Sequence, residues 1–220
     1  MRNRWWLALI AGAIALILWV VTDLGAAGSQ DLTNFDSHAV ARLETDMWRS
    51  YYARNRVALF GELGELLRTQ YHMAFWSSSA GAFHAARAAV VFQRGSGRAE
   101  YERALPDLRS FYALIRKGSS VPFDVEDAAR CELEWWIVHR ERSRHQPGDL
   151  EHALAALQAR LYRRPEAAFE DHAKARADAM MLCDAGNAAG FVSEADWTRI
   201  NVLLDRSWGS LRAVVSAGAK

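Results

Sequence analysis

Several ionisable side chains lie on helix faces that are otherwise apolar. Glu44, for example, follows Val40 and precedes Met47 at the spacing that places side chains on one face of a helix. Charged groups on such faces become buried when helices pack, so they pair with one another or bind a ligand. The side chains with this pattern are Glu44, His84, Arg87, Glu134, His172 and Arg176. We expect these six residues to converge in the core, and we call them the buried cluster.

The buried cluster allows two interpretations. In the first, its carboxylates and imidazoles bind a metal ion or a cofactor inside a helical bundle. The ligands would then be Glu44, His84, Glu134 and His172. In the second, Arg87 and Arg176 neutralise the glutamates in an ion-pair network that serves only the fold. We favour the network, because a buried charge needs a partner whether or not a ligand is bound.

Known motifs for catalysis are absent from the sequence. None of the 7 histidines follows a glutamate at the Glu-x-x-His spacing of di-iron bundles. The chain also lacks His-Glu-x-x-His, Gly-x-Ser-x-Gly and Ser-x-x-Lys. The glycine-rich segment 94–97 has neither the lysine of a phosphate-binding loop nor a preceding strand pattern. We therefore predict no catalytic residue, no metal and no cofactor, and a non-enzymatic role is the better expectation.

Cys131 and Cys183 are the only cysteines. An oxidising compartment would allow a disulfide between them, and both fall in predicted helices that one bridge could join. Two separate buried thiols are an equally good interpretation, because free cysteine packs like a small apolar residue. No Cys-x-x-Cys motif occurs, which disfavours thioredoxin-type chemistry.

One aromatic segment falls between two predicted helices. Its Trp76 cannot be assigned to the apolar face of a helix. Exposed aromatic side chains are typical of partner-binding surfaces and of contacts with a membrane surface. We therefore expect an interaction patch formed by Tyr71, His72, Met73, Phe75 and Trp76.

The chain opens with an uncharged apolar run over residues 5–21. As a helix it would be roughly 26 Å long, close to the thickness of a bilayer's hydrocarbon core. Its length, the following Asp23 and tryptophans near both ends favour a membrane-spanning helix in contact with lipid. A cleaved signal peptide is the alternative, because small residues follow at 25–29.

The charges beside this run predict its orientation. Arg2 and Arg4 precede it, and no lysine or arginine follows until Arg42. Because positive charge stays on the cytoplasmic side, we expect a single-pass protein of the bacterial inner membrane with a cytoplasmic N-terminus. The remaining chain would be periplasmic. The predicted domains are an anchor and short linker over 1–30 and an extracytoplasmic domain over 31–220.

Helical periodicity recurs along the second domain, and no strand pattern is convincing. Caps and breakers divide this domain into about seven helices with short connections. Their ranges are 36–70, 77–93, 98–117, 124–144, 149–164, 165–185 and 194–215. The sequence thus predicts an all-α fold, with an N-terminal transmembrane helix followed by a compact antiparallel helical bundle.

The net charge and the predicted architecture limit the classes of function that this protein can have. The net charge of +1 gives no support to nucleic-acid binding. An anchor, a helical domain and the missing catalytic motifs together favour an accessory or scaffold subunit that contacts other subunits of an inner-membrane complex. The alternative is an enzyme that binds a metal or cofactor through the buried cluster.

Overall fold

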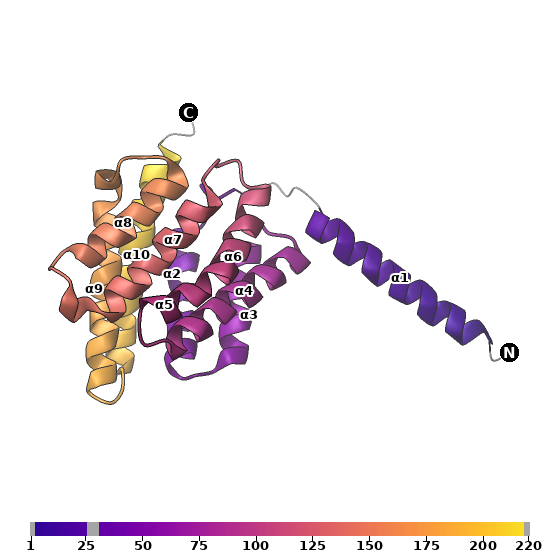
Figure 1. Cartoon of the computed structure of the whole chain (residues 1–220), viewed down its shortest axis with the longest axis horizontal. Helices are drawn as coiled ribbons and strands as arrows, with labels where there is room; N and C mark the ends of the chain where they lie inside the picture. The colour runs from indigo at the N-terminus through magenta and orange to yellow at the C-terminus, as the bar shows by residue number, and fades with distance from the viewer. Residues whose placement is uncertain (1–2, 26–30, 218–220) are drawn as a thin grey trace.

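The computed structural model describes residues 3–25 and 31–217, and these ranges contain helices and no strands (Figure 1). The predicted all-α fold is thereby confirmed. The α-helices are α1 (Asn3–Gly25), α2 (Ser37–Tyr52), α3 (Arg56–Thr69), α4 (Phe75–Arg94), α5 (Arg98–Tyr101), α6 (Leu105–Gly118), α7 (Val125–Arg140), α8 (Asp149–Tyr162), α9 (Glu170–Ala188) and α10 (Glu194–Ser216). Short 3-10 helices are η1 (Glu102–Ala104), η2 (Arg142–Arg144) and η3 (Glu166–Phe169).

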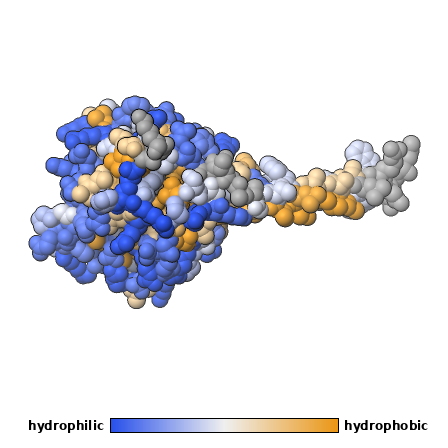
Figure 2. All heavy atoms as spheres, turned by 90° about the horizontal axis from the view of Figure 1, so that it is seen from above, coloured by the Kyte–Doolittle hydropathy of each residue, from blue (hydrophilic) through white to orange (hydrophobic). Residues whose placement is uncertain are grey.

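Helix α1 projects from the other helices as a separate rod (Figure 1). Its segment Ala8–Gly25 is long and apolar enough to cross a bilayer and is unburied, properties that a membrane anchor and a signal sequence share. Figure 2 shows apolar residues along α1 beside a mostly hydrophilic helical domain. The small residues at 26–29 and the charge of Arg2 lie outside the described residues.

The remaining helices form a closed ring. Each of α2, α3, α4, α6, α7, α8, α9 and α10 packs against the next in this order, and α10 packs against α2 to complete the circuit. Short loops explain the sequential contacts, because they return each helix beside its predecessor. Contact between α10 and α2 joins the two ends of the domain and leaves an interior that several helices line.

The structure has nine α-helices after α1 in the described ranges, rather than about seven. The predicted helix 36–70 is two helices, because Arg54 adopts a left-handed backbone (φ 57°) and Asn55 caps α3. The predicted helix 98–117 is also divided. Its first part is the short α5, and Pro106 stands in the first turn of α6.

Local capping signals place most helix starts. Asp36, Asp124 and Ser193 cap α2, α7 and α10, as predicted. The predicted cap Asp149 is wrong by one position, because Gly148 (φ 96°) is the capping residue of α8. Helix α4 likewise begins at Phe75, before its predicted start at residue 77.

Candidate functional site

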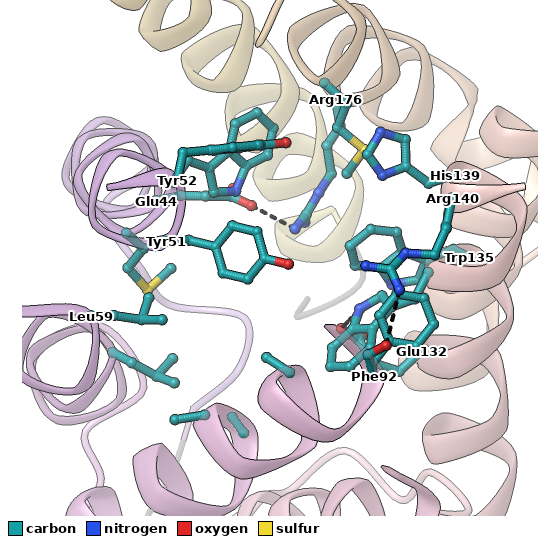
Figure 3. Close-up of a pocket in the computed structure, with 18 of the residues that line it drawn as sticks. Glu44, Tyr51, Tyr52, Leu59, Phe92, Glu132, Trp135, His139, Arg140 and Arg176 are labelled. Atoms are coloured by element: carbon teal, nitrogen blue, oxygen red, sulfur yellow. Dashed lines mark hydrogen bonds and ion pairs between the residues drawn. The ribbon is translucent and has the colours of Figure 1, made fainter. Parts of the chain in front are cut away.

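The interior of the ring holds a groove of about 490 Å³, which we call the central groove. Side chains from α2, α3, α4, α7 and α9 line it. In Figure 3, side chains of α2 and α7 face each other across the opening, with Arg176 of α9 between them. The fold therefore brings residues from opposite ends of the domain to one concave site, the usual form of a ligand pocket.

Aromatic rings make up much of the lining. They belong to Trp48, Tyr51, Tyr52, Phe92, Trp135 and Trp136. The charged and imidazole side chains of the lining are Glu44, Glu132, His139, Arg140, Arg142, Arg176 and Asp184. The ring faces of this lining can contact an apolar or cationic ligand, and the few polar groups can orient that ligand.

Glu44 is almost fully buried, with an exposed fraction of 2%. One carboxylate oxygen accepts a hydrogen bond from Nη2 of Arg176 (2.5 Å), and the other accepts one from Nε1 of Trp208 (2.6 Å). The Arg176 guanidinium also lies over the ring of Trp135 (5.5 Å). The negative charge of Glu44 is thus compensated by one arginine and held in a fixed orientation.

Glu132 also lines the central groove, but its partners are neutral. One oxygen accepts from the hydroxyl of Tyr112 (2.8 Å) and the other from Nε1 of Trp136 (3.0 Å). Burial, followed by the charge of Glu132, raises the pKa of Tyr112 well above its ordinary value, so Tyr112 stays protonated and donates. In the described part of the chain Glu132 has no ion-pair partner.

Asp184 contacts three other side chains of the groove lining. It accepts a hydrogen bond from the Tyr52 hydroxyl (3.1 Å), forms an ion pair with Nη1 of Arg142 (2.8 Å) and contacts Nε2 of His139 (3.1 Å). Burial raises the pKa of Asp184. The hydrogen bond from His139 and the charges of His139 and Arg142 lower it by more, so the pKa of Asp184 is below its ordinary value. Its charge is therefore satisfied within the protein.

The Arg140 guanidinium binds backbone carbonyl oxygens. Its Nη1 donates to the carbonyls of Phe92 (3.0 Å) and Gly95 (3.2 Å), and its guanidinium lies over the Phe92 ring (4.7 Å). This cation at the C-terminal end of α4 complements the helix dipole. It fixes α7 against α4 along one wall of the groove.

The structure does not bring the predicted buried cluster together. Only Glu44 and Arg176 of the six form an ion pair with each other. His84 and Arg87 instead contact Asp107 of α6, at 2.9 and 2.6 Å. The prediction that they converge with Glu44 is wrong because α4 turns this face toward α6 rather than toward α2 and α9.

Glu134 also lies elsewhere. It is bound by Nη2 of Arg98 (2.6 Å), and its side chain is half-exposed. The inward glutamate of α7 is Glu132, because the groove-facing side of α7 includes Trp135, Trp136 and His139 rather than Ile137. The predicted network between Glu134 and the cluster arginines is therefore wrong.

His172 is buried beside α10. Its Nδ1 lies 2.8 Å from Oγ of Ser207, and its ring packs edge-on against Trp208 (5.5 Å). Burial and then the nearby charge of Arg176 lower its pKa to about 3, so the imidazole is neutral at physiological pH. This environment is that of a core histidine.

The alternative metal site is not assembled. Its four proposed ligands, Glu44, His84, Glu134 and His172, have separate partners. No group of three or more potential ligands occurs among the residues that the structure describes.

Cys131 and Cys183 are separate free thiols, and Cys183 is fully buried. Of the two interpretations of the cysteines, the structure contains the one without a disulfide. Burial raises the pKa of both thiols, that of Cys183 to about 11. Neither is therefore activated as a nucleophile.

The aromatic segment between α3 and α4 is only partly a surface. Met73 is in the core and Tyr71 packs edge-on against Phe35, so these two do not form a continuous exposed patch. His72 and Phe75 are exposed. Trp76 packs against Trp19 of α1, which places this end of the segment at the junction with the apolar helix.

Three acidic residues at these sites are not predicted from the sequence. Asp107 follows Pro106 in the first turn of a helix, where an acid is expected for capping reasons alone. Asp184 had no distinguishing neighbour. Glu132 could have been found, because its spacing from Trp136 and His139 defines a polar and aromatic face of α7.

No protein family, curated protein or solved structure matches the chain. The central groove and the junction with α1 are therefore the two features from which a function can be inferred.

Proposed function

We propose that this protein is a membrane-anchored binding domain whose central groove holds an organic cation with an apolar body. The observation that carries the proposal is Glu132, a carboxylate that lines the groove and is bound only by the neutral donors Tyr112 and Trp136. Each of its oxygens retains a lone pair that a protonated amine can use.

The charges around the groove support a cationic ligand. Arg176 balances Glu44, and Arg142 balances Asp184. Arg140 binds carbonyl oxygens at the end of α4. Glu132 is the carboxylate of the lining that forms no ion pair among the described residues, so its oxygens are available to a positive ligand.

The aromatic lining supports the same class of ligand. Ring faces attract a cation electrostatically and also cover apolar surface. The volume of about 490 Å³ falls within the range typical of small-molecule pockets, roughly 300–1,000 Å³. A primary or substituted amine attached to a ring or a short aliphatic chain fits these requirements.

The anchor and the cellular location belong to the same proposal. Helix α1 supports attachment to a membrane, and the arginines before its apolar run support a cytoplasmic N-terminus with the helical domain in the periplasm. The role of an accessory or scaffold subunit in a membrane complex stays a prediction. A domain that binds a ligand beside the membrane is compatible with that role.

Calorimetric titration with a simple amine tests the groove. We expect the full chain in detergent to bind benzylamine and to bind its neutral analogue benzyl alcohol much more weakly, because only the amine can pair with Glu132. Glu132→Gln keeps the side-chain shape but removes the charge, so it should reduce benzylamine affinity at least about tenfold, as expected for loss of a charge-assisted hydrogen bond.

Glu134→Gln is the matched control. It removes a carboxylate from the same helix, but this one faces Arg98 outside the groove. We expect wild-type affinity in this variant. Equal binding of amine and alcohol, or equal losses in the two variants, would refute a cation site at Glu132.

A further inference from the structure

The end of α1 is attached to the helical domain through aromatic rings. Trp19 stacks on Phe75 with ring centroids 5.8 Å apart and meets Trp76 edge-on at 5.3 Å. Phe75 and Trp76 also contact each other at 5.2 Å. Phe75 nevertheless remains 45% exposed and Trp19 50% exposed, so these two rings present apolar surface outward.

Polar contacts fix the same junction. The carboxylate of Asp23 in α1 accepts hydrogen bonds from the backbone N–H groups of Trp76 (3.2 Å) and Ser77 (3.0 Å). It therefore supplies the N-terminal cap of α4, whose own capping position, Ala74, has no side-chain acceptor. Lys117 of α6 donates to the carbonyl of Leu24. Two helices of the domain thus bind the last turn of α1.

This attachment determines the depth of the aromatic rings in a bilayer. Trp19 lies roughly 3 Å along the helix axis before the end of the uncharged run at Val21. If α1 spans the hydrocarbon layer, Trp19 lies at its outer boundary, where tryptophan is favoured. Phe75 and Trp76 lie within 5.8 Å of Trp19 by ring centroid, so they must enter the same interfacial layer.

We propose that Trp19, Phe75 and Trp76 form a membrane seat, a surface through which the domain rests on the lipid headgroup region. The proposal rests on the proposed anchor, but it adds that the domain is held against the bilayer in one orientation instead of hanging on a free tether. The occupant is lipid, because the exposed ring of Phe75 packs directly on Trp19, which belongs to the exposed apolar helix α1.

Nitroxide labels on the full chain in phosphatidylcholine–phosphatidylglycerol vesicles test the seat. The labels replace single residues in a Cys131→Ser, Cys183→Ala background whose helicity is checked first. Ala74→Cys places a label beside the rings while leaving them intact, because Ala74 is exposed. Phe191→Cys is the control, since this residue is 73% exposed in the loop between α9 and α10, away from α1 (Figure 1).

Collision with oxygen and with a water-soluble nickel complex reports the depth of each label. We expect residue 74 to collide more with oxygen and less with nickel than residue 191. A third label, at Leu16→Cys within α1, separates the two proposals. Lipid exposure at 16 together with full nickel access at 74 would overturn the seat alone. Nickel access at 16 would overturn the anchor, and the seat with it.

Removal of the Asp23 cap supplies the second measurement. Asp23→Ala should increase nickel access and mobility at residue 74, because α4 loses the acceptor that ties it to α1. Asp31→Ala is the matched control, as Asp31 caps a turn at Thr33 and does not contact α4. Unchanged accessibility in Asp23→Ala would show that the junction does not hold the domain at the bilayer.

Discussion

The Glu44 carboxylate and the Arg176 guanidinium lie 2.5 Å apart, although 132 positions separate them in the sequence. This ion pair crosses the interior of the ring from α2 to α9, and the hydrogen bond from Trp208 extends it to α10. One buried carboxylate therefore joins the first helix of the ring to its last two. The closure of the ring depends on this polar contact as well as on apolar packing.

Arg176→Met should destabilise the protein strongly. The variant leaves the Glu44 charge buried without a counter-ion, a change that typically costs about 3–5 kcal/mol. Urea denaturation followed by circular dichroism measures the free energy of unfolding.

Arg42→Met is the matched control for this prediction. Arg42 lies on the same helix as Glu44, but its partner Asp46 is 3.7 Å away and both side chains are substantially exposed. Such surface pairs contribute roughly 0–1 kcal/mol. Similar losses in the Arg176 and Arg42 variants would contradict a structural role for the Glu44–Arg176 pair.

The sequence predicted structure best where the interaction is local. Ser193 and Asp124 cap helices through atoms a few positions away, so their role follows from the pattern. The start of α4 could not be predicted in this way. Its cap comes from Asp23, whose partners Trp76 and Ser77 are 53 and 54 positions away.

The residues of the central groove could likewise be predicted only in part from the sequence. Periodicity correctly placed Glu44 and Arg176 on inward faces, but it could not say which helix each face would meet. Helix α7 has one side packed against α6 and α8 and another open to the ring interior. The spacing of apolar residues identified the packed side of α7 and therefore selected Glu134. Glu132 lies on the side that is open to the ring interior.

Ser193→Ala should weaken the start of α10. Oγ of Ser193 accepts from the backbone N–H of Asp196 (3.1 Å) and donates to the Asp196 carboxylate (2.7 Å). Loss of an N-cap serine costs about 0.5–2 kcal/mol, measurable by thermal or urea unfolding. Ser110→Ala replaces a serine inside α6 and should be neutral or slightly stabilising, because alanine has the higher helix propensity. The reverse order would argue against the cap.

The two cysteines should both react as thiols. Alkylation of the protein after unfolding without reductant should modify Cys131 and Cys183, as counted by mass spectrometry, because the structure contains both as free thiols. Cys183 should be protected in the folded protein, since it is fully buried and its pKa is raised to about 11. A requirement for reductant before either residue reacts would indicate a disulfide.

His172 should make the fold less stable as the pH falls. Burial holds its pKa at about 3 in the folded protein, against 6.5 for an ordinary histidine. Between these values the unfolded chain binds a proton at His172 that the folded chain does not. The free energy of unfolding therefore declines as the pH falls from about 6.5 toward 3. Above about pH 6.5 the stabilising contribution of the neutral His172 is fully present.

Urea titrations between pH 4 and pH 7 measure this effect as a slope. His172→Gln removes the titrating group, so its stability should fall less steeply with acid than that of the wild type, whatever constant loss the altered packing causes. The carboxylates titrate in the same range but are common to both proteins, so the difference in slope isolates His172. A His172→Gln slope equal to that of the wild type would show that water or a counter-charge reaches the imidazole in the folded state.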